Sequence, residues 1–213
     1  MTGNDALVTR CLIDGNTMMN GNPIGQNTSG GIHATKGRIE NCVITNNVGM
    51  AYNGANASGL YLEGSVVVLN CTVLDNRMGS GFEGGGVQAA NASAVVRNCI
   101  IDGNLNGDGT ETNYWGNGAS FSYCLSSDAA PEGSEGCIAA RPVFDARKAL
   151  VLAKRTPGIG QGSVVGFEDR LLEATDFFGR PRVKHVSRQG VADIDIGAAE
   201  SEYLLKGLRI HFR

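Results

Sequence analysis

The most promising chemistry in the sequence lies in a Gly- and Asn-rich segment, residues 105–116. The segment carries Asp108 and Glu111, followed by Tyr114 and by Trp115, the only tryptophan in the chain. An aromatic ring presents an apolar face to the C–H face of a sugar ring, and neighbouring polar groups bond the sugar hydroxyls. These four residues therefore predict a glycan-binding surface. The alternative is that Trp115 folds back to cover apolar surface.

The start of the same segment matches the opening of a calcium-binding loop, Asp-x-Asn-x-Asn-Gly. Its candidate oxygen ligands are Asp102, Asn106 and Asp108. The twelfth position of such loops is a Glu that binds through both oxygens, but Asn113 stands there in this chain. Ca²⁺ at these three residues is one prediction and a plain polar turn is the alternative. No other cofactor is expected.

Cleavage of a polysaccharide needs paired carboxylates, or Ca²⁺ together with a base that removes a proton. The carboxylates near predicted strands are Asp14, Glu40, Asp75 and Asp102, and the nearby basic residues are His33, Lys36, Arg38 and Arg97. They do not form a dense cluster within one part of the chain, so most are expected to face solvent. The sequence therefore identifies no catalytic residue.

A repeated segment must position these side chains. Its pattern is Cys, then Ile or Val two residues later, then Asn five residues later. Full copies begin at Cys11, Cys42, Cys71 and Cys99, and a partial copy begins at Cys124. Successive copies are 25 to 31 residues apart. A period of about 20–50 residues is typical of stacked repeats.

The pattern within each repeat predicts two short strands. Cys and the Ile or Val two residues later point to the same side of one strand, while small or apolar residues five and three before the Cys mark another. The residue directly before the Cys is polar in the four full copies, so the chain must bend there to keep it out of an apolar interior. One repeat cannot bury its apolar face alone, whereas a stack can. The predicted fold is all-β, a parallel β-helix with coils about 4.8 Å apart.

Two columns of identical residues should run along this stack. The asparagines, expected to hydrogen-bond from coil to coil at a corner, are Asn16, Asn47, Asn76 and Asn104. The cysteines, expected to be buried free thiols, are Cys11, Cys42, Cys71 and Cys99. Stacked Cβ atoms about 4.8 Å apart exceed the usual disulfide span of roughly 3.5–4.5 Å. A bridge between Cys124 and Cys137, which enclose a loop, stays open.

The composition changes after Asn117, beyond which the chain contains no asparagine. Residues 1–137 are therefore expected to form the coils, and residues 138–213 a C-terminal capping segment over the last coil. Nothing amphipathic precedes the first coil, so additional N-terminal sequence or a partner is expected to cover it. The net charge of −3 offers no basic footprint for nucleic acid. No apolar run reaches the roughly 18 residues of a membrane span.

Three stretches of the C-terminal part carry a resemblance. They are Arg141-Pro142-Val143-Phe144, the stretch from Thr156 to Gly162, and the stretch from Thr175 to Arg182 followed by Asp193 to Glu200. With the Asn-Cys-x-Ile repeats, they make the chain resemble the C-terminal part of secreted bacterial right-handed parallel β-helix proteins of the choice-of-anchor type. It is also similar to polymorphic outer-membrane passenger domains. The resemblance implies export and an extracellular or cell-surface location, but no particular reaction.

Taken together, these observations favour a non-catalytic extracellular or cell-surface β-helix domain that binds glycans or surfaces, with a polysaccharide or a cell-surface glycan as its expected partner. Two alternatives remain. One alternative is that the chain is part of a polysaccharide lyase or glycoside hydrolase, and the other is that it is a purely structural stalk. Release of oligosaccharide would indicate the enzyme, and absence of both release and binding would indicate the stalk.

Overall fold

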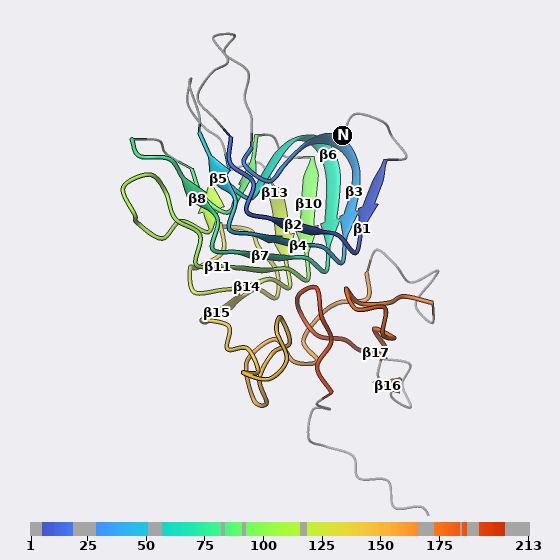
Figure 1. The fold of residues 1–213 in the computed structure, drawn as a ribbon. Helices are drawn as coiled ribbons and strands as arrows, with labels where there is room; N and C mark the ends of the chain where they lie inside the picture. Colours follow the sequence, from blue (N-terminus) through green and yellow to red (C-terminus); the bar gives the residue numbers. More distant parts are fainter. Residues whose placement is uncertain are drawn as a thin grey trace, which may run out of the picture.

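The structure is a computed structural model that describes residues 6–18, 29–50, 57–81, 84–90, 93–115, 119–165, 173–183, 185–186 and 192–202. Within these ranges the chain is all-β and has no helix. Accordingly, no helix there is long and apolar enough to cross a membrane. Successive coils stack along one axis and form two parallel sheets, so the fold is a β-solenoid (Figure 1), which confirms the predicted fold class.

Each coil contributes strands to both sheets. The first sheet has the order β1 (Leu7–Thr9), β3 (Ile32–Glu40), β6 (Leu60–Leu69), β10 (Ala94–Arg97), β13 (Ala119–Ser122), and β9 (Val87–Ala89) pairs with β6 and with β12 (Tyr114–Trp115). The second sheet has the order β2 (Leu12–Asp14), β4 (Val43–Thr45), β7 (Thr72–Leu74), β11 (Ile100–Asp102), β14 (Leu125–Ser126), β15 (Ile138–Ala139). Two small sheets pair β5 (Val48–Gly49) with β8 (Arg77–Met78) and β16 (His185–Val186) with β17 (Ala192–Asp193).

The bend expected before each cysteine is present in every copy. The residues at this corner have φ between 50° and 55°, and we call them the corner column: Arg10, Asn41, Asn70, Asn98 and Tyr123. Asparagine tolerates this left-handed conformation better than other residues that carry a side chain. Its short polar side chain also bonds stray backbone groups at the corner.

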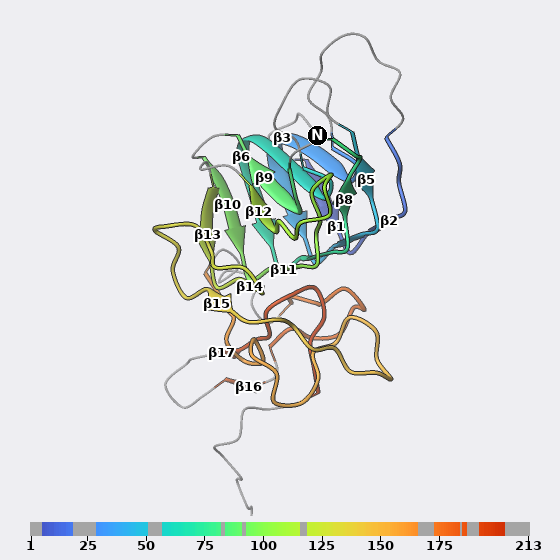
Figure 2. The same cartoon turned by 90° about the vertical axis from the view of Figure 1, so that its left-hand side faces the viewer.

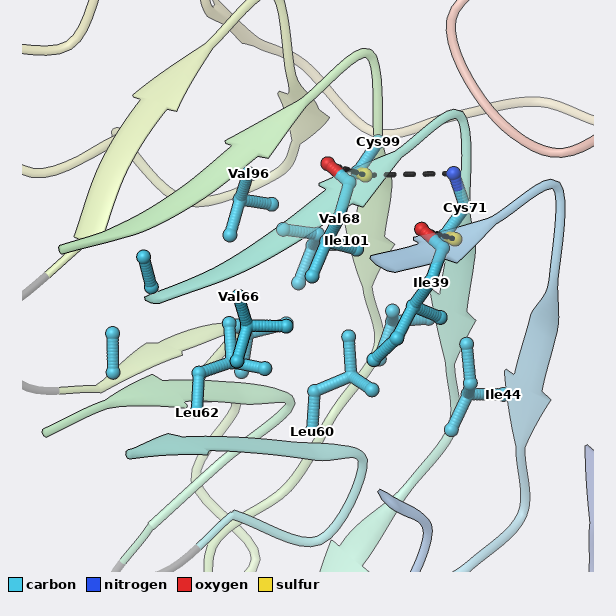
Figure 3. Packing of buried hydrophobic residues seen from close by; sticks show 14 of the residues in the cluster. Ile39, Ile44, Leu60, Leu62, Val66, Val68, Cys71, Val96, Cys99 and Ile101 are labelled. Carbon is cyan, nitrogen blue, oxygen red and sulfur yellow. Dashed lines mark hydrogen bonds between the residues drawn. The ribbon is translucent and has the colours of Figure 1, made fainter. Parts of the chain in front are cut away.

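The interior between the sheets is apolar and includes the thiol column. Cys42, Cys71, Cys99 and Cys124 are fully buried, and the Cys71 N–H donates to Cys99 Sγ at 3.4 Å (Figure 3). All six cysteines are free. Cys11, however, is exposed, which corrects the expectation of a buried thiol. It belongs to the first coil, where the structure describes a stacked neighbour on one side only.

The asparagine column forms a continuous hydrogen-bonded ladder. Asn16, Asn47 and Asn76 each donate from Nδ2 to Oδ1 of the asparagine in the next coil, at 2.8, 2.8 and 2.9 Å. Asn104 donates in the same way to Asn113 at 3.0 Å. Asn113, which stands in the Gly- and Asn-rich segment 105–116, is fully buried. The ladder therefore has five members, and Asn113 ends it.

The C-terminal segment beyond β15 lies along the side of the solenoid (Figures 1 and 2, orange to red). Leu152, Ile159 and Ile196 pack on Ile100 and Leu125, whose side chains face outward from the second sheet. Besides the last coil, over which the sequence predicted a capping segment, this part of the chain bonds to the sides of earlier coils. The Gly197 N–H donates to the Asn98 carbonyl at 2.8 Å and the Ala198 N–H donates to Thr72 Oγ1 at 2.9 Å.

The other end of the solenoid presents apolar residues to solvent. β1 and β2 are the outermost described strands of their sheets. Leu7 and Leu12 on these strands are 52% and 58% exposed. Such an uncovered β-edge is where a further β-structure can pair.

Candidate functional site

Asp102 and Glu111 both lie beside Arg141, a residue contributed from just after β15. The Arg141 guanidinium reaches Asp102 Oδ2 at 3.2 Å and Glu111 Oε2 at 2.6 Å. Ser127 bonds the remaining oxygens, donating its N–H to Asp102 at 2.7 Å and its hydroxyl to Glu111 at 2.6 Å. These contacts join the last coils to the start of the C-terminal segment, so both carboxylates have structural partners.

The surroundings of this cluster shift the pKa values of two carboxyl groups in opposite directions. Burial alone would raise the pKa of Glu111, but donors from Ser127, Arg141 and Asn113 outweigh it and lower the pKa to about 2. The pKa of Asp75 is raised by burial and by the nearby carboxylates of Asp102 and Glu111. At neutral pH the cluster therefore holds an ionised Glu111 beside a carboxyl group that binds its proton more tightly than usual.

The candidate calcium ligands are engaged separately. Asn106 Oδ1 accepts the N–H of Asp108 at 3.2 Å and of Thr110 at 3.0 Å, and Asp108 Oδ1 accepts the Thr110 N–H at 2.8 Å. Asp102 instead faces Arg141 and Ser127. Within the described ranges no cluster of three or more His, Cys, Asp or Glu side chains is arranged to hold a metal ion. Calcium at this loop stays a prediction from the sequence.

Tyr114 and Trp115, near the end of the Gly- and Asn-rich segment, form strand β12, so their side chains point to opposite faces. Tyr114 packs against the interior and meets Phe121 edge-on, with ring centroids 4.9 Å apart. Burial raises the pKa of its hydroxyl. Trp115 is half-buried and faces outward from the first sheet. The two aromatics therefore do not form a joint platform, and only Trp115 is placed to meet a ligand.

Strand register places Trp115 at the end of a row on the outer face of the first sheet. The paired residues, which we call the outer column, are His33, Tyr61, Gln88 and Trp115. The His33 and Tyr61 rings lie 5.0 Å apart, and His33 Nε2 is 2.8 Å from Glu63 Oε2. Tyr61 and Gln88 are only 3% and 4% exposed, whereas His33 and Trp115 at the two ends are half-buried.

Gln88 carries a buried side-chain oxygen whose hydrogen-bonding capacity is unused. Among the buried side-chain nitrogen and oxygen atoms that the structure describes, Gln88 Oε1 alone has no hydrogen-bond partner. Burying an unpaired acceptor costs about 1–3 kcal/mol. Since such groups are rare in folded proteins, an unmet acceptor next to an outward-facing tryptophan marks a place where a ligand donor would be gained.

Several of the remaining candidates for acid–base chemistry are dispersed and bonded to other side chains. Glu40 Oε1 accepts from Arg38 Nε at 2.7 Å, Asp14 Oδ1 accepts from Asn46 Nδ2 at 2.9 Å, and Arg97 Nε donates to Ser122 Oγ at 2.9 Å. These contacts are local stabilising interactions between neighbouring coils or within a strand. No family model, curated protein or solved structure matches the chain.

Proposed function

We propose that this solenoid is a non-catalytic glycan-binding domain that works outside the cell or at its surface. The observation that supports it most is the pairing of Trp115 with Gln88 across β12 and β9, because Gln88 Oε1 has no partner. A polysaccharide or cell-surface glycan offers what the two residues can use, a C–H ring face and hydroxyl donors. The extracellular location rests on the resemblance described above.

The geometry of the outer column suits this role. A sugar ring stacked on Trp115 lies next to Gln88, its neighbour in the column. The last torsion of a glutamine side chain is soft, so a small rotation turns its amide oxygen toward a sugar hydroxyl. The new hydrogen bond would offset the cost of desolvating Gln88 Oε1, which is already present in the free protein. Binding therefore gains more from this contact than from one between groups that are solvated beforehand.

Replacing Trp115 with alanine tests the proposal. Loss of a central stacking aromatic usually costs about 2 kcal/mol or more of binding energy. Trp115→Ala should therefore abolish retention on a glycan array while the far-UV spectrum and thermal midpoint stay close to wild type. Phe178→Ala is the matched control, because Phe178 is an aromatic that is 50% exposed on the C-terminal segment. The proposal fails if wild-type protein binds no glycan, or if Trp115→Ala binds as well as wild type.

A second candidate function, glycoside hydrolysis, is favoured by one observation. Asp75 has a raised pKa close to Asp102 and Glu111, and carboxyl groups with separated pKa values are the acid–base pattern of glycosidases. Glu111 and Asp102 are already occupied by Arg141 and Ser127, which weakens this reading. Release of reducing sugar ends that Asp75→Asn abolishes would establish the hydrolase. A protein that neither binds nor cleaves glycans would be the structural stalk.

A further inference from the structure

A cavity of about 280 Å³ lies where the C-terminal segment crosses the first coils. It is lined by corner-column residues Arg10, Asn41 and Asn70, by Leu69, and by Glu40 and Glu173. The lining residues from the first sheet are at the C-terminal ends of β1, β3 and β6, whereas Glu173 comes from the C-terminal segment. The outer column crosses β3 and β6 near their beginnings. The cavity is therefore a separate place on the first sheet.

The corner column shows which polar groups the C-terminal segment satisfies and which it leaves. At Asn98, Nδ2 donates to the Ser163 carbonyl at 2.6 Å and to Asn70 Oδ1 at 2.9 Å, and Oδ1 accepts the Ser163 N–H at 2.8 Å. The amide of Asn98 is thus fully used. The segment closes the corner completely at this coil.

One and two coils earlier the same amides are only half used. Asn41 Oδ1 accepts from Arg182 at 2.8 and 3.0 Å, and Asn70 Oδ1 accepts from Asn98. Their Nδ2 groups donate to nothing in the part of the chain that the structure describes. Asn70 is only 4% exposed, so its open amide reaches little except the cavity that it lines.

Arg10 adds a third open donor at the same corner. It has φ 50°, a conformation that the equivalent positions of the next three coils fill with asparagine. This conformation costs an arginine more free energy than an asparagine, and residues held in strained backbone conformations are concentrated at functional sites. Its guanidinium has no ion-pair partner within the described ranges, although Gly179 of the C-terminal segment lies close by.

Acceptors and apolar surface complete the lining. Glu40 is buried and paired with Arg38, and Glu173 is exposed at the rim. Leu69 supplies an apolar wall. The guanidinium of Arg182 is already engaged, because it bonds Asn41, Glu200 and several carbonyls. A cavity with planar donors, carboxylate acceptors and an apolar wall, and with charges of both signs, suits a neutral polyhydroxylated ring better than an anion.

We infer that this corner cavity binds a single neutral sugar ring, which makes it a second glycan subsite and so extends the proposed function. Asn41 Nδ2, Asn70 Nδ2 and Arg10 donate to ring hydroxyl oxygens, while the carboxylates accept hydroxyl protons. A volume of about 280 Å³ is enough for one ring, so the site holds a single sugar unit at a time. In the outer column, by contrast, only His33 and Trp115 at the two ends are partly exposed.

Arg10→Asn tests the subsite without threatening the fold. Asparagine is the residue that the next three coils use at this corner, so the thermal midpoint should be unchanged or higher. Binding of the free sugars glucose, galactose, mannose and N-acetylglucosamine is followed by saturation-transfer NMR and titration calorimetry. For the sugar that binds wild-type protein best, Arg10→Asn should bind about tenfold more weakly, the effect of one lost charge-assisted hydrogen bond. Tyr123→Asn is the matched control, with the same corner conformation but away from the cavity, and should bind normally.

Three results would overturn the inference. One is that none of the four sugars binds the wild-type protein. Another is that Arg10→Asn binds as tightly as wild type. The third is that inorganic sulfate binds and displaces the sugar, which would make the cavity an anion site. Trp115→Ala separates this inference from the proposed function, because it should keep sugar binding in the cavity while it loses array binding. Array binding that depends on Trp115 but not on Arg10, with no free-sugar binding, refutes the subsite alone.

Discussion

Gln88→Met should make the protein more stable and a poorer glycan binder. Methionine has nearly the same length and shape as glutamine but no amide. Gln88 is 4% exposed and its Oε1 is unpaired, so the substitution removes a desolvation cost of about 1–3 kcal/mol. Some packing mismatch offsets the gain, since volume-conserving core changes usually cost less than about 1.5 kcal/mol. We therefore expect a net gain of about 1 kcal/mol in the free energy of unfolding.

Chemical denaturation measures this gain directly, and thermal unfolding should show it as a rise of about 2–4 °C for a chain of this size. Gln161→Met is the control, because Gln161 is exposed and surface substitutions usually stay within about 0.5 kcal/mol. On the glycan array, Gln88→Met should lose signal while Gln161→Met keeps it. A Gln88→Met protein that is destabilised by more than about 1 kcal/mol would show that Oε1 has a stabilising partner in the free protein, which would refute the reasoning.

Three further predictions concern the solenoid itself. Asn76→Ala removes a fully buried member of the ladder, which bonds Asn47, Asn104 and the Ile44 carbonyl, and should lower the free energy of unfolding in urea by about 3–5 kcal/mol. Asn16→Ala, at the exposed end of the ladder, should lower it by about 1 kcal/mol, and equal losses would contradict a stacked ladder. The pKa of Glu111 is lowered to about 2 from an ordinary value near 4.5, so its contribution to stability is present above pH 4.5 and is lost as the pH falls toward 2. Glu111→Gln should therefore flatten the decline in thermal midpoint between these pH values, and an unchanged decline would show that other groups cause the decline. Alkylation of native protein should modify Cys11 and leave Cys42, Cys71 and Cys99 unmodified until denaturant is added, and mass spectrometry that finds any of those three modified in native protein would contradict their burial.

The coil architecture was predictable because the residues that build it recur. A cysteine, an Ile or Val side chain and an asparagine at fixed spacing fill equivalent positions in the four full copies of the repeat. The same signal extends to the outer column, where it was missed. Ile32-His33, Leu60-Tyr61, Val87-Gln88 and Tyr114-Trp115 each place an interior residue before an outward one, directly after a Gly, or after Asn113. Aligning these four pairs would have placed Trp115 on a strand and Tyr114 in the interior.

The course of the C-terminal segment was not predictable, because its contacts do not repeat. Arg182 bonds Asn41 across 141 residues of sequence, and Ser163 bonds Asn98 across 65. Such contacts depend on how an irregular chain meets an already formed surface, and no period encodes them. The corner cavity follows from the same contacts, since it is the space that the segment leaves between the coils it crosses. Arg10 alone gave a sequence signal, as the one arginine in a column otherwise filled by asparagine and tyrosine.

The two proposed sites follow from one property of the stack. In a solenoid whose asparagine ladder and corner amides bond from coil to coil, a polar group left over stands out. Such groups gather at Gln88 beside Trp115, and at Asn41, Asn70 and Arg10 around the cavity. Both places lie on the outer side of the first sheet, near opposite ends of β3 and β6. If both bind glycan, Trp115→Ala with Arg10→Asn should weaken binding of a long glycan by more than either change alone. The two losses in binding free energy should add only for ligands long enough to reach both sites. Short oligosaccharides should therefore respond to one substitution or the other.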